Sequence, residues 1–212
     1  ENWPIAIILF AAFLLRFWQF WDIPFSHDEL SAINRAMVSS WSELIESIKA
    51  DSHPAGIELL IFILVKSIGF KPWIVKLPFA LAGLASVWLI YHIGEKTISK
   101  ETGWISAALL GSTQYAITFS QWARPYSIGL FLVLLLWWLL IKLKETKTDR
   151  LKLGVCIALT VAAIAYTHYF ALLQAILLVG LFLPKLERKL QISILLSSLG
   201  GFLLWLPHLS IT

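Results

Sequence analysis

Four short segments of this 212-residue chain carry side chains that could do chemistry. The first is Ser26-His27-Asp28-Glu29, where one of two adjacent carboxylates could act as a general base on an acceptor hydroxyl or amine. Ser26 and Glu29 also have the spacing of a helix capping box, and acids in a first turn complement the helix dipole. Capping needs only Glu29, which leaves Asp28 available as a base, and the two interpretations can coexist.

His53-Pro54 forms the second segment, directly before an apolar run. A histidine before proline suits a turn as well as it suits a binding site. His27, His53 and the nearby acids could also hold a divalent metal, but their spacing matches no strong metal-binding motif. The candidate site therefore includes His53, and a divalent metal is the less favoured interpretation.

Arg124 and His168 are the centres of the other two segments, Gln121–Tyr126 and Tyr166–Tyr169. The guanidinium of Arg124 presents a fixed fork of donors that suits phosphate, and Tyr126 adds a hydroxyl nearby. Arg124 could instead extend to lipid headgroups, with Pro125 starting a helix. His168 could bind phosphate, hold a leaving group or stack on a sugar, and its tyrosine neighbours equally suit an interfacial aromatic belt.

The elements that position these residues are predicted to be membrane helices. The chain is 58% hydrophobic and only 14% charged, whereas soluble domains carry about 25% charged residues. This composition excludes an ordinary soluble globule, a disordered tail and a secreted disulfide scaffold, and the single Cys156 cannot form an intrachain disulfide. We predict an all-α polytopic membrane protein.

The net charge of +4 indicates topology rather than a nucleic-acid partner. Ten of the seventeen Lys and Arg lie in three short stretches between apolar runs, and basic short loops mark the cytoplasmic face. With these stretches inside, all four polar segments fall on the non-cytoplasmic side, where they could form one external cleft. The basic residues are Lys96 and Lys100; Lys142, Lys144, Lys147, Arg150 and Lys152; and Lys185, Arg188 and Lys189.

The apolar runs predict one transmembrane domain over residues 1–212, with seven spans and a cytoplasmic N-terminus. The run 57–70 is too short to cross, because fourteen helical residues reach about 21 Å against a hydrocarbon core of about 30 Å, and it contains Glu58 and Lys66. We expect it to dip or lie flat; a short crossing is the alternative. The predicted spans are 3–21, 73–94, 103–120, 126–143, 152–168, 170–184 and 191–208.

The segment 22–56 is predicted to be a large external loop with interfacial helices. It holds six acids and two basic residues, which suits the outside of the membrane. Its apolar residues recur at spacings of mostly three and four, the pattern of an amphipathic helix, or of two helices joined near Ser39-Ser40. These residues are Leu30, Ile33, Met37, Trp41, Leu44, Ile45 and Ile48.

The order of these motifs resembles the GT-C membrane glycosyltransferases, in particular the branch of protein O-mannosyltransferases and the bacterial aminoarabinose transferase of lipid A. Asp28-Glu29 matches the acidic pair of the family's first external loop, and His53-Pro54-Ala55 keeps two residues of its His-Pro-Pro. Ser120 to Tyr126 matches Ser-x-x-Ala-Arg-x-Tyr, and Tyr166 to Phe170 matches Tyr-Thr-His-Tyr-Phe.

The resemblance implies a GT-C-type transmembrane helix bundle, with Asp28 as the base and Glu29 as its catalytic neighbour. It implies that His53, Arg124, Tyr126, His168 and Tyr169 bind substrate. Family members usually continue with further spans and often a soluble domain, so we expect this chain to be the N-terminal part of a longer protein. The implied location is the bacterial cytoplasmic (inner) membrane, with the site facing the periplasm or exterior.

The leading hypothesis is a hexosyl- or pentosyltransferase that moves a sugar from a polyprenyl-phosphate donor to a glycan, lipid or protein acceptor. A single displacement would invert the anomeric carbon. The alternative is a non-catalytic GT-C-like subunit that acts as a scaffold or lipid-binding partner in a larger membrane complex. A secondary transporter fits less well, because transporters place their critical polar residues near the bilayer midplane and in repeated halves.

Overall fold

The computed structural model describes residues 3–49, 53–146 and 148–211, and these residues form helices and no strands. The predicted all-α class is confirmed. The helices are α1 (Trp3–Phe17), α2 (His27–Ala36), α3 (Trp41–Lys49), α4 (Gly56–Ile68), α5 (Pro72–Thr97), α6 (Lys100–Ser112), α7 (Gln114–Ser120), α8 (Pro125–Glu145), α9 (Arg150–Thr167), α10 (Tyr169–Phe182) and α11 (Arg188–Trp205), with short 3-10 helices η1 (Leu183–Lys185) and η2 (Leu206–Ser210).

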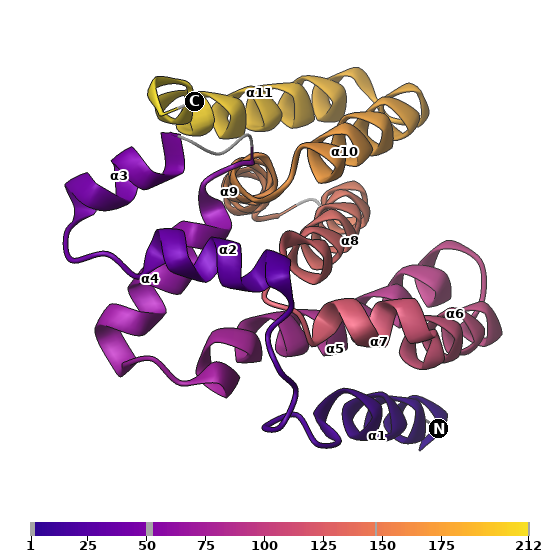
Figure 1. Cartoon of the computed structure of the whole chain (residues 1–212). Helices are drawn as coiled ribbons and strands as arrows, with labels where there is room; N and C mark the ends of the chain where they lie inside the picture. Colours follow the sequence, from indigo (N-terminus) through magenta and orange to yellow (C-terminus); the bar gives the residue numbers. More distant parts are fainter. Residues whose placement is uncertain (1–2, 50–52, 147, 212) are drawn as a thin grey trace.

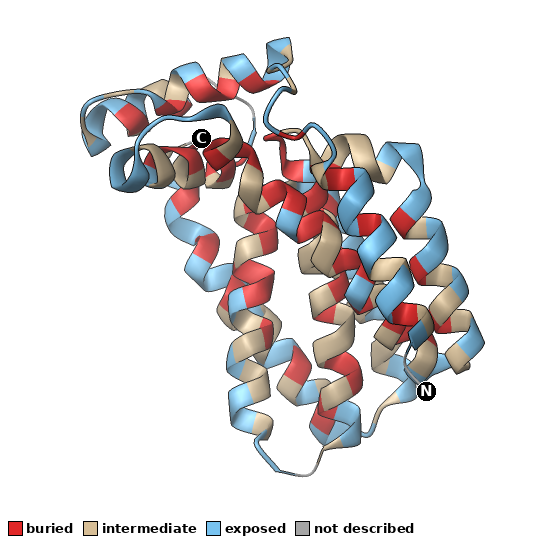
Figure 2. Ribbon diagram, turned by 90° about the horizontal axis from the view of Figure 1, so that it is seen from below, coloured by how far each residue is buried: buried red, intermediate tan, exposed pale blue. Residues whose placement is uncertain are grey.

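The long helices run side by side as a bundle (Figures 1 and 2). α5 packs against α6 and α8, and α9 packs against α8, α10 and α11. The two termini lie at opposite ends of the bundle, and further helices lie across the end that carries the C-terminus (Figure 2). Among the described residues, four helices are long and apolar enough to cross a membrane: α5, α8, α9, and α11 together with η2.

Shorter apolar helices lie beside these four. α1 and the segment from α10 through η1 are apolar but have fewer than eighteen residues each. α4 has thirteen residues and carries Glu58 and Lys66, in keeping with a segment that does not cross. The protein is an integral membrane protein, and the count of seven crossings stays a prediction.

Small residues let the central helices approach closely. A Cβ on Gly94 of α5 would lie 2.9 Å from the Cα of Gly103 on α6, so neither position has room for a larger side chain. Close backbone approach at small residues is a common way to pack helices in lipid. Large apolar side chains point outward instead, among them Ile105, Leu109 and Leu199, as expected of a surface that faces lipid.

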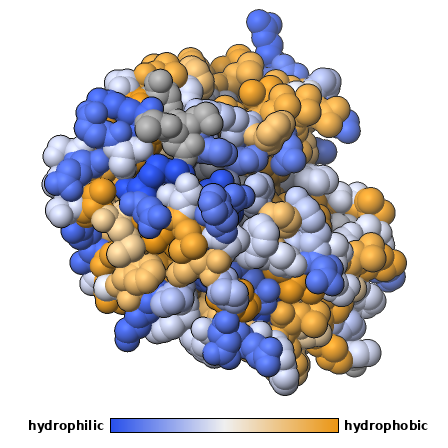
Figure 3. Space-filling model, in the orientation of Figure 1, coloured by the Kyte–Doolittle hydropathy of each residue, from blue (hydrophilic) through white to orange (hydrophobic). Residues whose placement is uncertain are grey.

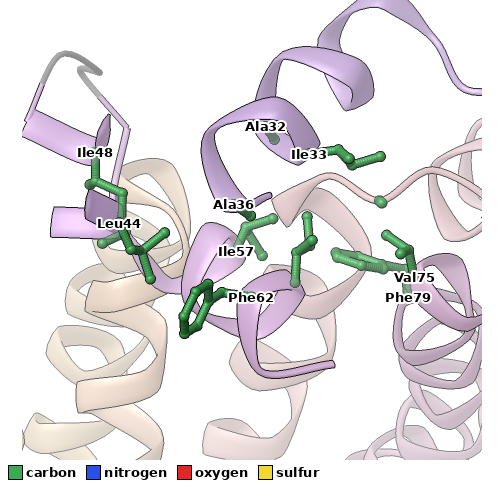
Figure 4. Close-up of a cluster of buried hydrophobic side chains, with 12 residues drawn as sticks. Ala32, Ile33, Ala36, Leu44, Ile48, Ile57, Phe62, Val75 and Phe79 are labelled. Carbon is green, nitrogen blue, oxygen red and sulfur yellow. The ribbon is translucent and has the colours of Figure 1, made fainter. Parts of the chain in front are cut away.

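The first loop folds onto the bundle through an apolar cluster of its own. Two helices form there, α2 and α3, separated near Ser39-Ser40 as the sequence predicts. Figure 4 shows their apolar side chains meeting those of α4 and α5. The buried members include Ala32, Ile33 and Ala36 of α2, Leu44 and Ile48 of α3, Ile57 and Phe62 of α4, and Val75 and Phe79 of α5.

The apolar run 103–120 is divided into two helices, α6 and α7, by the extended backbone of Thr113. A helix end inside a membrane protein leaves carbonyl groups that need donors. Arg16 of α1 supplies them: its Nη1 donates to the carbonyl of Gly111 at 2.9 Å, and its Nη2 donates to that of Leu110 at 3.2 Å. The arginine is fully buried and thereby ties α1 to the break.

Candidate active site

The start of α2 is fixed by the capping box that the sequence predicts. The amide of Ser26 donates to Glu29 Oε2 at 2.8 Å, and the amide of Glu29 donates to Ser26 Oγ at 3.3 Å. Each side chain therefore satisfies a backbone donor that the helix itself leaves free. This pair sets the orientation in which His27 and Asp28 enter the first turn.

Glu29 also connects α2 to two distant parts of the chain. Its side chain is fully buried, and its Oε1 accepts the amide hydrogen of Ala123 at 2.7 Å. The same oxygen lies 3.4 Å from Nζ of Lys76, whose ammonium also donates to the carbonyls of Pro24 at 2.9 Å and Ile23 at 3.3 Å. One buried ion pair thus holds the loop before α2, helix α5 and the segment before α8 together.

Asp28 is placed differently from its neighbour. Its side chain is 66% exposed, and its Oδ1 lies 4.0 Å from Nδ1 of the exposed His27. Its backbone carbonyl lies 3.4 Å from Nη1 of Arg124, which donates to it. The carboxylate is therefore exposed and lies outside the capping box, while the backbone of the same residue contacts Arg124. Figure 3 looks onto this end of the bundle and shows hydrophilic residues gathered over α2.

His53, Arg124 and His168 come together although they are far apart in sequence. Gly56, at the start of α4, abuts the backbone of Tyr166, where an added Cβ would collide with the carbonyl oxygen. This contact brings the His53 segment beside the junction of α9 and α10. His53, Arg124 and Thr167 line a cavity of about 10 Å³. Burial lowers the pKa of His168, and the neighbouring charges of His53 and Arg124 lower it further.

A larger cavity of about 470 Å³ opens beside this cluster. Tyr126 and His168 both line it, with ring centroids 5.7 Å apart. Arg16 lines it as well, from the end of α1. Tyr169 is 41% exposed and is not among the residues that line either cavity in the described part of the chain.

Several charged residues of this region were not assigned by sequence reasoning. Lys76 is not part of the site predicted from the sequence, although a lysine inside an apolar helix is itself a signal of a buried partner. Arg35 of α2 pairs with the buried Glu58 of α4 at 3.0 Å, beside the smaller cavity. Within residues 3–49, 53–146 and 148–211, no three His, Cys, Asp or Glu side chains are grouped as metal ligands.

A helical membrane bundle that gathers an arginine and two histidines below an acidic loop fits the class expected from the motifs, the membrane glycosyltransferases of the GT-C type. The family profile of the dolichyl-phosphate-mannose-protein mannosyltransferases matches residues 52–211, about three quarters of the chain, and the protein belongs to that family. No curated protein and no solved structure matches the chain. The matched region includes His53, Arg124 and His168 and begins after Asp28 and Glu29.

Proposed function

We propose that this protein transfers a sugar from a polyprenyl-phosphate carrier to an acceptor on the non-cytoplasmic side of the membrane, with Asp28 as the general base. Family membership supports a glycosyltransferase, and it implies a lipid-linked sugar as the donor. The observation that carries the proposal is the different environment of two neighbouring acids: Glu29 is buried and fully engaged, whereas the side chain of Asp28 is exposed and its backbone carbonyl accepts from Arg124.

The proposed reaction is a single displacement. The carboxylate of Asp28 takes the proton of the acceptor hydroxyl or amine as its oxygen or nitrogen bonds to the anomeric carbon. The bond from that carbon to the phosphate oxygen breaks, and its electron pair leaves with the polyprenyl phosphate. Attack opposite the leaving group inverts the anomeric configuration.

Arg124 is the proposed partner of the leaving phosphate. It is 8% exposed, donates to the backbone carbonyl of Asp28 and lines the smaller cavity, and the next residue, Pro125, lines the larger cavity with Tyr126 and His168. A fixed guanidinium placed where negative charge develops lowers the barrier most in a site that excludes water. In this proposal His168 and Tyr126, which line the larger cavity, contact the sugar or the phosphate, and His53 lines the smaller cavity with Arg124.

Glu29 has a positioning role in this proposal. Both its oxygens already accept backbone hydrogens, and its charge is paired with Lys76. A carboxylate so engaged is poorly placed to exchange a proton with an acceptor. It holds the α2 turn against the Ala123–Arg124 segment, so that Asp28 and Arg124 keep a fixed separation.

The test is donor turnover in proteoliposomes. The purified protein would be supplied with a panel of undecaprenyl-phosphate monosaccharides, and with native membranes as the acceptor source. Asp28→Asn is expected to lower transfer by at least a hundredfold, in line with the loss of a general base. Glu46→Gln, an equally conservative change at an exposed carboxylate of α3, is the matched control and should transfer as wild type does.

Wild-type transfer by Asp28→Asn would overturn the assignment of the base. A wild-type protein that turns over no donor, yet co-purifies with other membrane proteins equally well with or without Asp28, would favour the scaffold alternative.

A further inference from the structure

The N-terminus of α8 has backbone donors without an intrahelical partner. Arg124 is its N-cap residue and Pro125 is its first residue, and no side chain of the described residues caps this end. The amides of Tyr126 and Ser127 lie in the first turn, before the ladder of intrahelical hydrogen bonds begins. Such an end carries partial positive charge and suits an anion.

Ser127 adds a second and independent observation. The residue is 4% exposed, its Oγ is buried without a hydrogen-bond partner among the described residues, and it lines the 470 Å³ cavity. Hydroxyls elsewhere in these helices donate to the carbonyl four residues earlier: Ser86 does so at 2.8 Å and Thr160 at 2.7 Å. A buried hydroxyl without a partner is costly, so the position calls for a ligand that bonds to it.

The charges around the cavity indicate that this ligand is an anion. Arg16 and His168 line it, and no Asp or Glu is among the described residues that do. Arg16 donates only to carbonyls, and no carboxylate of the described residues pairs with it. The cavity therefore has a buried positive charge on the α1 side and a helix N-terminus on the α8 side, with no acidic side chain among its described lining residues to balance them.

The remaining lining selects the kind of anion. Leu110, Phe119 and Leu130 give the cavity apolar walls, and the strongly exposed Tyr115 and Phe170 lie at its margin, on the outside of the bundle. An inorganic ion would use the donors and leave these walls unfilled. A phosphate that carries a long hydrocarbon chain would use both.

We infer that the first turn of α8, with the hydroxyl of Ser127, is a subsite for the phosphate of a lipid phosphate ester, and that Arg16 supplies unpaired positive charge to it from α1. The inference rests on the proposed function in one respect: it takes this lipid to be the sugar donor or the polyprenyl phosphate that remains after transfer. Ser127 and the adjacent amides then hold the phosphate while Arg124 contacts the oxygen that leaves the sugar.

Binding measurements on the purified full chain in nanodiscs test the subsite without requiring turnover. The probes are decaprenyl phosphate, decaprenol with the same chain and no phosphate, and inorganic phosphate. Ser127→Ala is expected to weaken decaprenyl phosphate about tenfold, equal to about 1.4 kcal/mol, and to leave decaprenol unchanged. Ser127→Asp keeps a favourable residue in a helix's first turn but places an anion in the subsite, and should weaken decaprenyl phosphate further.

Ser198→Ala is the matched control. Its hydroxyl is also buried without a partner among the described residues, but it lines a separate apolar cavity between α9, α10 and α11. This variant should bind all probes as wild type does. The subsite would be overturned if wild type and both Ser127 variants bound decaprenyl phosphate with equal affinity. It would also be overturned if the variants lost as much affinity for decaprenol as for decaprenyl phosphate. Ser127-dependent binding of inorganic phosphate at similar concentrations would overturn the assignment to a lipid.

The same assay separates this inference from the proposed function. Asp28→Asn should bind decaprenyl phosphate normally and fail to transfer. If Asp28→Asn transfers while binding still depends on Ser127, the proposed base is wrong and the subsite stands. If Asp28→Asn is inactive and binding is indifferent to Ser127, the subsite is wrong and the proposed function stands.

Discussion

Replacing Lys76 by methionine is the most informative perturbation of the buried ion pair. The substitution keeps an unbranched side chain of similar length and removes only the ammonium. In the wild-type protein that ammonium lies 3.4 Å from Glu29 Oε1 and donates to the carbonyl of Pro24 at 2.9 Å, and the two side chains are 1% and 0% exposed. In Lys76→Met, the carboxylate of Glu29 stays buried without its counter-ion.

The expected loss of stability is large. Removing one partner of a buried ion pair costs about 3–5 kcal/mol, because the other charge is left uncompensated. The amides of Ser26 and Ala123 still donate to Glu29, at 2.8 and 2.7 Å, which places the expected value toward the lower end, about 3 kcal/mol. In the double variant with Glu29→Gln neither side chain of the pair carries a charge, so part of the loss should return. The return is reduced because the side-chain amide can accept only one of the two backbone hydrogens that Glu29 accepts.

The measurement is the free energy of unfolding in bicelles by steric trapping, with transfer measured in parallel. Lys49→Met is the matched control: Lys49 pairs with Glu46 at 2.6 Å, but both side chains are exposed, and such pairs contribute about 0–1 kcal/mol. A loss in Lys76→Met no larger than in Lys49→Met would refute the reasoning. So would a double variant no more stable than the single one.

Three further outcomes are expected. Arg124→Lys keeps the charge and loses the planar fork of donors, so transfer should fall about tenfold or more. This corresponds to the loss of a charge-assisted hydrogen bond, about 1.5–3 kcal/mol. Transfer at the wild-type rate would contradict the assigned contact. Burial and the charges of His53 and Arg124 lower the pKa of His168 in the folded protein. The unfolded chain therefore protonates this histidine more readily, and the stability of the fold should decrease as the pH drops below about 6.5. Wild type should therefore lose more thermal stability than His168→Gln between about pH 7.5 and about pH 5.5, and equal losses would exclude this cause. In a chain without Cys156, a cysteine at Gln121 should react with an impermeant reagent from outside and one at Thr146 only from the cytoplasm; labelling of both from one side would overturn the span count.

The parts of the fold that depend on local patterns could be predicted from the sequence. Hydropathy located the apolar helices, and the three-to-four spacing located α2 and α3. The capping box of Ser26 and Glu29 was visible because its partners are three residues apart. In each case the interacting residues lie within a few turns of one another, so the signal stays within a short window of sequence.

The features that escaped prediction depend on partners distant in the chain. The apolar run 103–120 shows no proline or charge at Thr113, and its break is stabilised by Arg16, whose bonds to Leu110 and Gly111 join residues more than ninety positions apart. In the sequence, Lys76 is an isolated cation in an apolar helix, and only the fold shows that Glu29 lies beside it. Ser127 gives no signal in the sequence, because only its burial and its lack of a partner distinguish it.

The bond between Arg16 and the end of α6 also bears on how the protein is made. A ribosome releases α1 long before α6, so of the three carbonyls that Arg16 bonds in the folded protein only that of Ala12, in its own helix, is present until α6 is made. Helix α1 can therefore enter the bilayer early but can reach its final place only after α6 has been inserted. Ala12 and Gly111 mark that docking event, because a Cβ on Gly111 would lie 3.4 Å from the Cβ of Ala12, near the spacing of a disulfide. A cysteine pair at these positions should cross-link in nascent chains long enough for α6 to have left the ribosome, and not in shorter chains that contain both cysteines but still hold α6 in the exit tunnel.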